Sequence, residues 1–272
     1  MKRFYLSVLF LCSFGSLFAG GPSFAFCDYS QGKVFIQENG EIVWEHKAPD
    51  SNDIWVLPNK NILFTAGKEV LEVSRKNDTI FHYTSESNIF ACQRLKNGNT
   101  FIGECDNGRL LEVSPDGSIV KDVSILPFGV KTGGHAFMRN ARCLDNGHYL
   151  VAHYGGKSVV EYDENGKAVW NIPISGGAHS VIRLPSGNTL VAVTDKDNNP
   201  GVFEYDMAGN IVWSLTNKDL PGTLKFAGGM HYLSDGRLFL TNWVGHVDAK
   251  NPVHLLVTVS YTHLTLPTNS LV

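Results

Sequence analysis

The sequence predicts an all-β fold, a β-propeller built from four-stranded blades. Two observations lead to this prediction: two short motifs alternate along the chain at a period near 40 residues, and turn residues separate short apolar runs throughout. No segment beyond the N-terminal stretch has the apolar period of a helix. Repeats of this length and strand content suit one propeller blade each.

The first motif is an apolar strand, a tight turn and a second apolar strand. Its turns contain Asn-Gly or Asp-Gly in most copies, and these residues allow the positive φ angles of tight hairpins. Each copy therefore predicts a β-hairpin. The five copies end at Trp44, Phe81, Lys121, Trp170 and Trp213, at intervals of 37, 40, 49 and 43 residues.

The second motif, Leu-x-[Asn/Ser/Asp]-Gly-x-x-apolar-apolar, lies between copies of the first and predicts another hairpin. Its copies begin at Leu57, Leu95, Leu144, Leu184 and Leu233. Two hairpins give four strands per repeat, which in the third repeat we expect near 109–114, 119–123, 141–144 and 149–153. The blades are expected at about 33–67, 68–105, 106–154, 155–200 and 201–246.

The two ends of the repeat region predict how the ring closes. Residues 23–28 look like an isolated fourth strand, and 252–258 look like the first strand of a further blade. Propellers close by joining such strands in one blade, so we expect six blades in the complete ring and five complete blades in this chain. The propeller domain is expected over 20–258, and seven blades stay open if the coding sequence was longer.

The N-terminal residues predict export. Lys2 and Arg3 precede an apolar stretch at 4–18 that ends in small residues, which is typical of a secretory signal peptide over 1–19, with cleavage after Ala25 as the alternative. The protein is then secreted or periplasmic. No other window is long and apolar enough to span a membrane.

Residues 259–272 differ from everything before them. The uncharged run VSYTHLTLPT resembles a translated sequencing adapter, so we expect this segment to be a non-native tail. A genuine β-rich tail is the alternative.

Composition narrows the classes of function. The chain has 272 residues, 43% of them hydrophobic and 18% charged, and its formal net charge is −3. These values indicate a globular protein and exclude a disordered chain or a nucleic-acid binder held by counterion release.

The repeats resemble the PQQ-like family of β-propellers, in particular secreted bacterial members with EVxxxGxxVW and RLPNGNTL patterns, over about 24–258. The resemblance implies a structural docking role for Trp44, Trp170 and Trp213. Quinoprotein enzymes of this family also carry an adjacent cysteine pair, which this sequence lacks, so no PQQ cofactor is expected. The family name describes the fold and does not define an activity.

The connections between strands fall into two classes on opposite faces. One class is uniformly tight, whereas the other is longer, variable and rich in glycine and polar residues. We expect a ligand site on the face with the long loops, around the mouth of the central channel. The candidate ligand-binding residues are His135, His153, His179, Asn242, Trp243, His246 and Glu104. Imidazoles suit acid–base, nucleophilic or metal chemistry, and a purely loop-capping role is the alternative.

One segment suggests a reaction. The run from His179 to Asn188 is similar to the His-x-x-x-x-Leu-x-x-Gly-Asn run of bacterial arylsulfotransferases, which are six-bladed propellers. The resemblance implies that His179 is a nucleophile and that Arg139 or Arg142 binds the transferred group, with His135 as a further candidate. The chain is shorter than those enzymes and lacks their N-terminal domain.

Metal and disulfide sites are weakly indicated. Residues 195–199 offer oxygen ligands at alternate positions, but they lack the glycine and distal glutamate of an EF-hand loop, so a solvated turn is favoured over a calcium site. No cysteine spacing suggests zinc. Cys27, Cys92, Cys105 and Cys143 remain after signal removal, and both disulfides and buried thiols stay open.

These observations favour an exported binding module that recognises a small molecule, a carbohydrate or a protein on its long-loop face. The alternative is an enzyme on the same scaffold, either a sulfotransferase acting through His179 or a lyase or hydrolase. No cofactor, nucleic-acid partner or membrane span is expected, and the sequence leaves the choice between enzyme and binding module open.

Overall fold

The computed structural model describes residues 23–127, 129–194, 200–220, 222–243, 255–260 and 263–265. Regular structure within these residues consists of β-strands, without a helix, so the all-β prediction is confirmed. It follows that this part of the chain has no helix capable of crossing a membrane. The predicted signal peptide over 1–19 lies outside the described residues.

The strands form six antiparallel sheets, five of four strands and one of three, and within each sheet the strands are neighbours in sequence order. The three-stranded sheet contains β1 (Phe24–Asp28), β2 (Lys33–Glu38) and β3 (Glu41–Lys47). The next three sheets contain β4 (Ile54–Val56), β5 (Ile62–Ala66), β6 (Glu69–Val73) and β7 (Thr79–Thr84); β8 (Ile89–Arg94), β9 (Thr100–Glu104), β10 (Arg109–Val113) and β11 (Ile119–Ser124); and β12 (Asn140–Cys143), β13 (Tyr149–His153), β14 (Ser158–Tyr162) and β15 (Ala168–Pro173). The last two contain β16 (Gly177–Arg183), β17 (Thr189–Thr194), β18 (Gly201–Tyr205) and β19 (Ile211–Thr216); and β20 (Ala227–Tyr232), β21 (Leu238–Asn242), β22 (Leu255–Ser260) and β23 (His263–Thr265).

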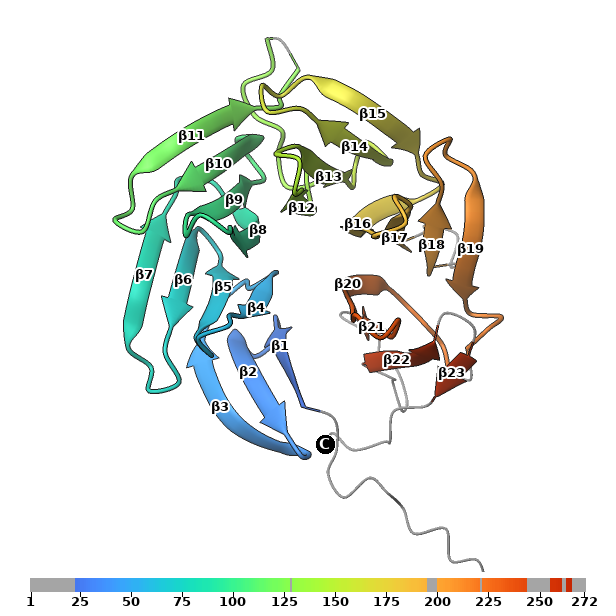
Figure 1. The fold of residues 1–272 in the computed structure, drawn as a ribbon, viewed down its shortest axis with the longest axis horizontal. Coiled ribbons are helices and arrows are strands. Elements are labelled where there is room, and N and C mark those ends of the chain that lie inside the picture. Colours follow the sequence, from blue (N-terminus) through green and yellow to red (C-terminus); the bar gives the residue numbers. More distant parts are fainter. Residues whose placement is uncertain are drawn as a thin grey trace, which may run out of the picture.

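The sheets surround a common axis, as Figure 1 shows, with β4, β8, β12, β16 and β20 innermost and β7, β11, β15, β19 and β23 outermost. This arrangement is a β-propeller with five four-stranded blades. The predicted fold and the predicted strand number per blade are therefore confirmed.

The predicted blade boundaries are wrong by half a repeat. Each blade begins with the hairpin of the second motif and ends with the hairpin of the first, so the predicted ranges 33–67, 68–105, 106–154, 155–200 and 201–246 each join parts of two blades. The physical reason is that the two hairpins alternate along the chain, and the sequence alone does not show which connection is made within a sheet. The register decides it: Arg109 pairs with Glu104, which places β10 beside β9 in one sheet.

Both end strands also take positions other than those predicted. Residues 23–28 were expected as an isolated fourth strand, but β1 pairs with β2 in the first sheet. β1 also packs against β4, just as β5, a second strand, packs against β8, so β1 has the position of a second strand. Residues 252–258 were expected to start a further blade, but β22 pairs with β21 as the third strand of the last sheet. The predicted tail boundary at 259 falls inside β22, and whether the tail is native stays a prediction.

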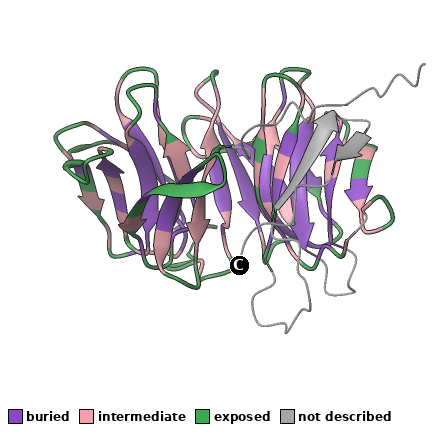
Figure 2. Cartoon of the chain, turned by 90° about the horizontal axis from the view of Figure 1, so that it is seen from below, coloured by how far each residue is buried: buried purple, intermediate pink, exposed green. Residues whose placement is uncertain are grey.

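The hydrophobic core lies between successive sheets. In four blades the second strand, β5, β9, β13 or β17, is buried along its full length, whereas β21 of the last blade is buried only in part. Figure 2 shows these buried inner strands and the exposed outer edges of the sheets. One apolar cluster, for example, joins Leu150 and Ala152 of β13 to Val181 of β16 and Val191 of β17. Because each cluster joins two neighbouring sheets, stability is built up blade by blade.

A repeated ion pair reinforces the contact between blades. Arg183 donates to Glu161 of the preceding blade at 2.6 Å, and Arg94 donates to Glu72 at the same distance. The Arg183 guanidinium also lies over the ring of Trp170, 4.6 Å from its centroid. These arginines pair with carboxylates that are themselves largely buried, so they act in docking rather than in solvent contact.

The three tryptophans predicted to act in docking lie on outer strands. Trp170 on β15 donates Nε1–H to the carbonyl of Met207 in the next blade at 2.9 Å. Trp44 on β3 is buried in the cluster between the first two sheets, and Trp213 on β19 packs against the cluster between the last two.

Candidate functional site

The connections separate two faces of the propeller. Turns between the first and second strands and between the third and fourth strands form a tight-turn face, and the remaining connections form the long-loop face. The innermost strands start at the long-loop face. One position of the repeat, five residues before the leucine that begins the second motif, lies near the start of the innermost strand in every blade. The residues at this position are Asn52, Phe90, Arg139, His179 and Gly228.

Two of these side chains, those of Phe90 and His179, belong to residues at β-bulges. In β8 the register passes from Ile89 to Ala91 and skips Phe90. In β16 it passes from Ala178 to Ser180 and skips His179. A β-bulge interrupts the alternation of side chains and re-aims the extra residue, and bulges are common beside functional sites. We refer to Phe90, His135, Arg139, His179 and Phe226, which contact one another as described below, as the axial cluster.

Arg139 is the centre of the axial cluster. Its guanidinium lies over the Phe90 ring, 4.4 Å from the centroid. Nη1 lies 3.0 Å from Nε2 of His135, and Nη2 lies 3.4 Å from Nε2 of His179. Because a guanidinium only donates, both imidazole nitrogens must accept, which requires both rings to be neutral. Partial burial lowers the pKa of Arg139, but an arginine this basic remains charged.

His179 is held as a neutral imidazole. Burial, and then the nearby charge of Arg139, lower the pKa of His179 to about 3. With Nε2 accepting from Arg139, the ring proton is on Nδ1, and this buried atom has no hydrogen-bond partner among the described residues. The nearby backbone of Gly228 acts in the opposite direction and raises the pKa of His179, but burial and the charge of Arg139 outweigh it.

Aromatic rings flank the cluster. The Phe226 ring is edge-to-face with His179 at 5.0 Å and with Trp243 at 5.1 Å. Trp243 is 41% exposed, and His135 is also exposed. The site therefore combines a cation, two neutral imidazoles and exposed aromatic surface.

Arg139 differs from the other arginines in the part of the chain that the structure describes. Six of these seven arginines form a salt bridge with a carboxylate: Arg75, Arg94, Arg109, Arg142, Arg183 and Arg237. Arg139 has no carboxylate partner among the described residues, and its electrostatic neighbours are Cys105, Tyr154 and Tyr29.

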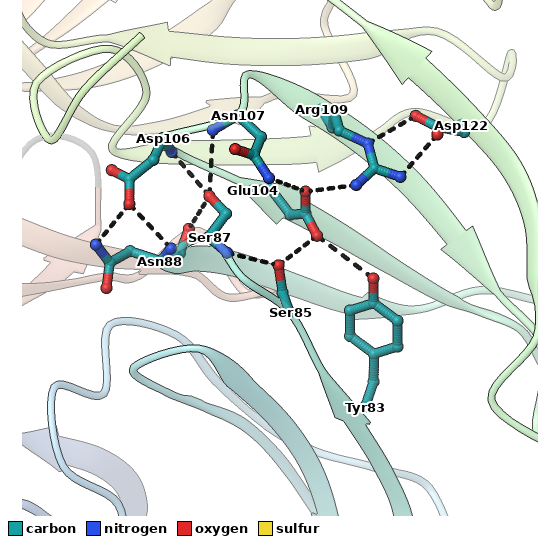
Figure 3. Close-up of polar contacts among 9 residues, drawn as sticks. All are labelled: Tyr83, Ser85, Ser87, Asn88, Glu104, Asp106, Asn107, Arg109 and Asp122. Atoms are coloured by element: carbon teal, nitrogen blue, oxygen red, sulfur yellow. Dashed lines mark hydrogen bonds and ion pairs between the residues drawn. The ribbon is translucent and has the colours of Figure 1, made fainter. Parts of the chain in front are cut away.

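Glu104, a predicted ligand-binding residue, is fully enclosed by protein donors. It is the last residue of β9 and is completely buried. Figure 3 shows its four donors: Ser85 at 2.6 Å and Tyr83 at 3.4 Å to one carboxylate oxygen, and Arg109 at 3.1 Å and Asn107 at 3.2 Å to the other. The carboxylate thus anchors the connection that leads into β8 and Phe90.

His153 and Asn242 have equivalent positions at the ends of β13 and β21. His153 donates Nδ1–H to the carbonyl of Phe137 at 2.9 Å and accepts from the Tyr162 hydroxyl at 2.8 Å. The side-chain oxygen of Asn242 accepts from the amides of Lys225 and Phe226 at 2.8 and 3.2 Å. Both side chains therefore hold loops that deliver residues to the axial cluster.

Arg142 is placed apart from the cluster. It makes a bidentate salt bridge with Asp53, two blades away, at 2.6 and 3.0 Å, and its guanidinium lies 5.1 Å from the Trp55 ring centroid. Asp53 also accepts from the amide of Cys92 at 3.0 Å. This pairing leaves Arg142 neutralised within the protein.

Sequence reasoning missed Phe90, Phe226 and Asp53. Alignment of the repeats on the leucine of the second motif would have placed Phe90 beside Arg139 and His179, because all three precede that leucine by five residues. No local pattern indicates Phe226 or Asp53, whose roles depend on partners in other blades.

Other predicted sites are only partly described. His246 and residues 195–199 lie outside the described residues. No group of three or more His, Cys, Asp or Glu side chains suited to a metal occurs among the residues that the structure does describe. Cys27, Cys92, Cys105 and Cys143 are free thiols, and burial raises the pKa of Cys105 to about 11.

Comparison with known proteins shows the fold. No protein-family model and no curated protein matches the sequence. A protein of unknown function from Bacteroides caccae has a TM-score of 0.78 and 23% identity, covering 88% of this chain and 90% of that chain. Virginiamycin B lyase from Staphylococcus aureus has a TM-score of 0.60 and 14% identity, covering 93% of this chain and 86% of the lyase chain. BBS1N, solved in complex with ARL6DN, has a TM-score of 0.53 and 17% identity, covering 91% of this chain and 88% of the BBS1N chain. At these identities the likeness extends to the fold and not to the activity.

Proposed function

We propose that the protein is a binding module that takes a small molecule at the axial cluster on its long-loop face. The observation behind this proposal is the partly exposed Arg139 guanidinium, which lacks a carboxylate partner in the described structure and lies among aromatic rings. A few convergent polar groups beside aromatic surface are the usual composition of a ligand site.

The surroundings of the cluster support binding, because they fix its shape. The buried side chains of Glu104, His153 and Asn242 each hold a loop next to the site through hydrogen bonds. A site whose loops are held in this way loses little conformational entropy when a ligand enters.

The same geometry favours binding over transfer through His179. A nucleophilic imidazole needs an accessible lone pair, whereas Nε2 of His179 faces Arg139 and Nδ1 is buried. The sulfotransferase hypothesis stays untested, and it predicts that His179→Ala abolishes transfer from an aryl sulfate donor.

Ligand-observed NMR on the full chain, with a mixed library of neutral and charged aromatic compounds, tests the binding proposal. We expect hits whose saturation transfer is lost in Trp243→Ala, because that exposed ring borders the cluster. Ile211→Ala, on the exposed outer strand β19, is the matched control and should keep them. Hits that respond equally to both variants, or an absence of hits, would refute the proposal.

We also propose that the sheet of β1, β2 and β3 is the sixth blade of the ring, in which β1 is the second strand and pairs with a further, innermost strand. Support comes from β1, which packs against β4 as the second strands of other blades pack against the next inner strand. Hydrogen exchange tests whether an innermost strand pairs with β1. If it does, the β1 amides that face away from β2 should exchange as slowly as those of β5; fast exchange of these amides would show that this edge of β1 is open and would contradict the proposal.

Export follows from the predicted signal peptide and is part of the proposal. Sequencing the N-terminus of protein recovered from a bacterial periplasm should show cleavage after Ala19. An intact Met1 would contradict export by this route.

A further inference from the structure

We propose that the axial cluster recognises an anionic oxygen group of its ligand, a carboxylate, sulfate or phosphate, and that Arg139 binds it. This inference rests on the proposed small-molecule site and names the chemistry that the ligand must have there.

The first argument is the number of donors that Arg139 has available. A guanidinium has five N–H groups. One bond to His135 and one to His179 use two of them, and within the described structure the other three have no hydrogen-bond partner. Carboxylate, sulfate and phosphate each present a pair of oxygens whose spacing matches two adjacent guanidinium N–H groups, so each can accept two parallel hydrogen bonds.

The second argument is charge. The two imidazoles accept hydrogen bonds from Arg139 and fix its orientation, but they are neutral and leave its positive charge uncompensated. No Asp or Glu of the described residues is among the electrostatic neighbours of Arg139. An incoming anion therefore meets one fixed cation that is not paired with any carboxylate of the described residues.

The third argument is the contrast with Arg142, which lies on β12, a few residues further along the same chain segment. Arg142 also lies over an aromatic ring, that of Trp55, yet it has a bidentate carboxylate partner in Asp53. Arg142 thus combines stacking on an aromatic ring with a carboxylate partner. Arg139 stacks on Phe90 in the same way but has no carboxylate partner among the described residues, so stacking alone does not explain how its charge is balanced.

Geometry restricts the approach to one side. The Phe90 ring covers one face of the guanidinium, and the two imidazoles occupy part of its edge. The anion therefore binds at the remaining edge, and the rest of the ligand extends toward Phe226 and Trp243. A small aromatic acid has the size and chemistry for this arrangement.

Calorimetric titration of the full chain at constant ionic strength tests the proposal with four probes: inorganic sulfate, inorganic phosphate, benzoate and the neutral isostere benzamide. We expect benzoate to bind at least tenfold tighter than benzamide, and sulfate or phosphate to compete with benzoate. Arg139→Gln should weaken benzoate binding at least tenfold and abolish the preference for benzoate over benzamide. Arg75→Gln is the matched control, because Arg75 is an arginine paired with Glu38 on the tight-turn face.

The outcomes separate this inference from the proposed function. If benzamide binds as tightly as benzoate and Trp243→Ala weakens both, the small-molecule site stands and the anion inference is overturned. If neither benzoate, sulfate nor phosphate binds, the anion inference is overturned, and the NMR library decides the proposed function separately. If Arg139→Gln does not fold, the wild-type preference for benzoate over benzamide and its competition by sulfate decide the matter alone.

Discussion

Single residues in this protein have roles that depend on how completely their polar atoms are paired. Glu104 has four donors, whereas Arg139 has two neutral acceptors and no carboxylate in the described structure. Both are polar side chains near the long-loop face, and residue type alone does not separate them. A fully paired buried group stabilises the fold, and an incompletely paired one is available to a ligand.

His179 makes stability depend on pH. Its pKa is about 3 in the folded protein, and an unfolded histidine titrates near 6.5. Above about pH 6.5 both states are neutral and there is no contribution. As the pH falls from about 6.5 toward 3, the unfolded state binds the proton first, so the free energy of unfolding decreases by up to about 1.4 kcal/mol per pH unit.

His179→Gln should remove this share of the acid sensitivity. Urea unfolding of both proteins at pH 7, 5 and 4 measures it, and the loss of stability toward pH 4 should be smaller in the variant. Burial also lowers the pKa of His153 and His231, but both proteins keep those residues. The same decline with pH in both proteins would show that His179 does not titrate as the structure indicates.

Glu104 predicts a large loss of stability on truncation. Glu104→Ala leaves its buried donors without an acceptor, and we expect the free energy of unfolding to fall by about 3 kcal/mol. Asp122→Ala is the comparison, because Asp122 pairs with the same Arg109 but is about half exposed, so its loss should cost less than about 1 kcal/mol. Equal losses in chemical denaturation would refute the distinction.

At the scale of the element, the turns between outer strands do more than reverse the chain. Gly117 and Gly166 occupy equivalent turns with φ of +88° and +81°. A Cβ on Gly117 would meet open space, whereas one on Gly166 would lie 2.8 Å from the carbonyl oxygen of Ser124 in the preceding blade. One glycine meets only a local backbone requirement, and the other also permits two blades to pack.

Substitution by alanine separates these two requirements. Gly117→Ala should cost about 1 kcal/mol, since only the left-handed conformation is penalised. Gly166→Ala should cost at least about 1 kcal/mol more, because the clash with Ser124 adds to the same penalty. Thermal unfolding midpoints of the two variants provide the measurement, and equal shifts would contradict the close approach.

At the scale of the whole molecule, contacts between neighbouring sheets account for most of the core, as in other repeat proteins. The Asp53–Arg142 pair is different, because it joins the second and fourth sheets, while Asp53 also accepts from Cys92 in the third. Three consecutive blades are therefore connected by one buried carboxylate.

Removal of this carboxylate should weaken cooperativity as well as stability. We expect Asp53→Ala to lower the free energy of unfolding by about 3 kcal/mol, since Arg142 then keeps a largely buried, unpaired charge. Unfolding monitored by tryptophan fluorescence and by circular dichroism should coincide in the wild type and separate in the variant. The double variant Asp53→Ala, Arg142→Met should recover part of the loss, and failure to do so would contradict the pairing.

Local patterns were sufficient to predict the all-β fold, the four-stranded repeat and the separation of tight turns from long loops. Strand alternation and turn residues act over fewer than ten residues, so a single chain displays them directly. The same patterns placed His135, Arg139 and His179 on one face, and the structure brings these three into contact.

Packing between distant segments determined the rest. The division into blades depends on which hairpins share a sheet, and the bulges at Phe90 and His179 depend on register with the neighbouring strand. Arg142 obtains its carboxylate from a residue 89 positions away, whereas Arg139 obtains none in the described structure. Partners this far apart in sequence become neighbours only when the blades assemble. The sequence therefore predicts the candidates, and only the tertiary structure distinguishes an arginine that is paired with a carboxylate from one that is not, within the described residues.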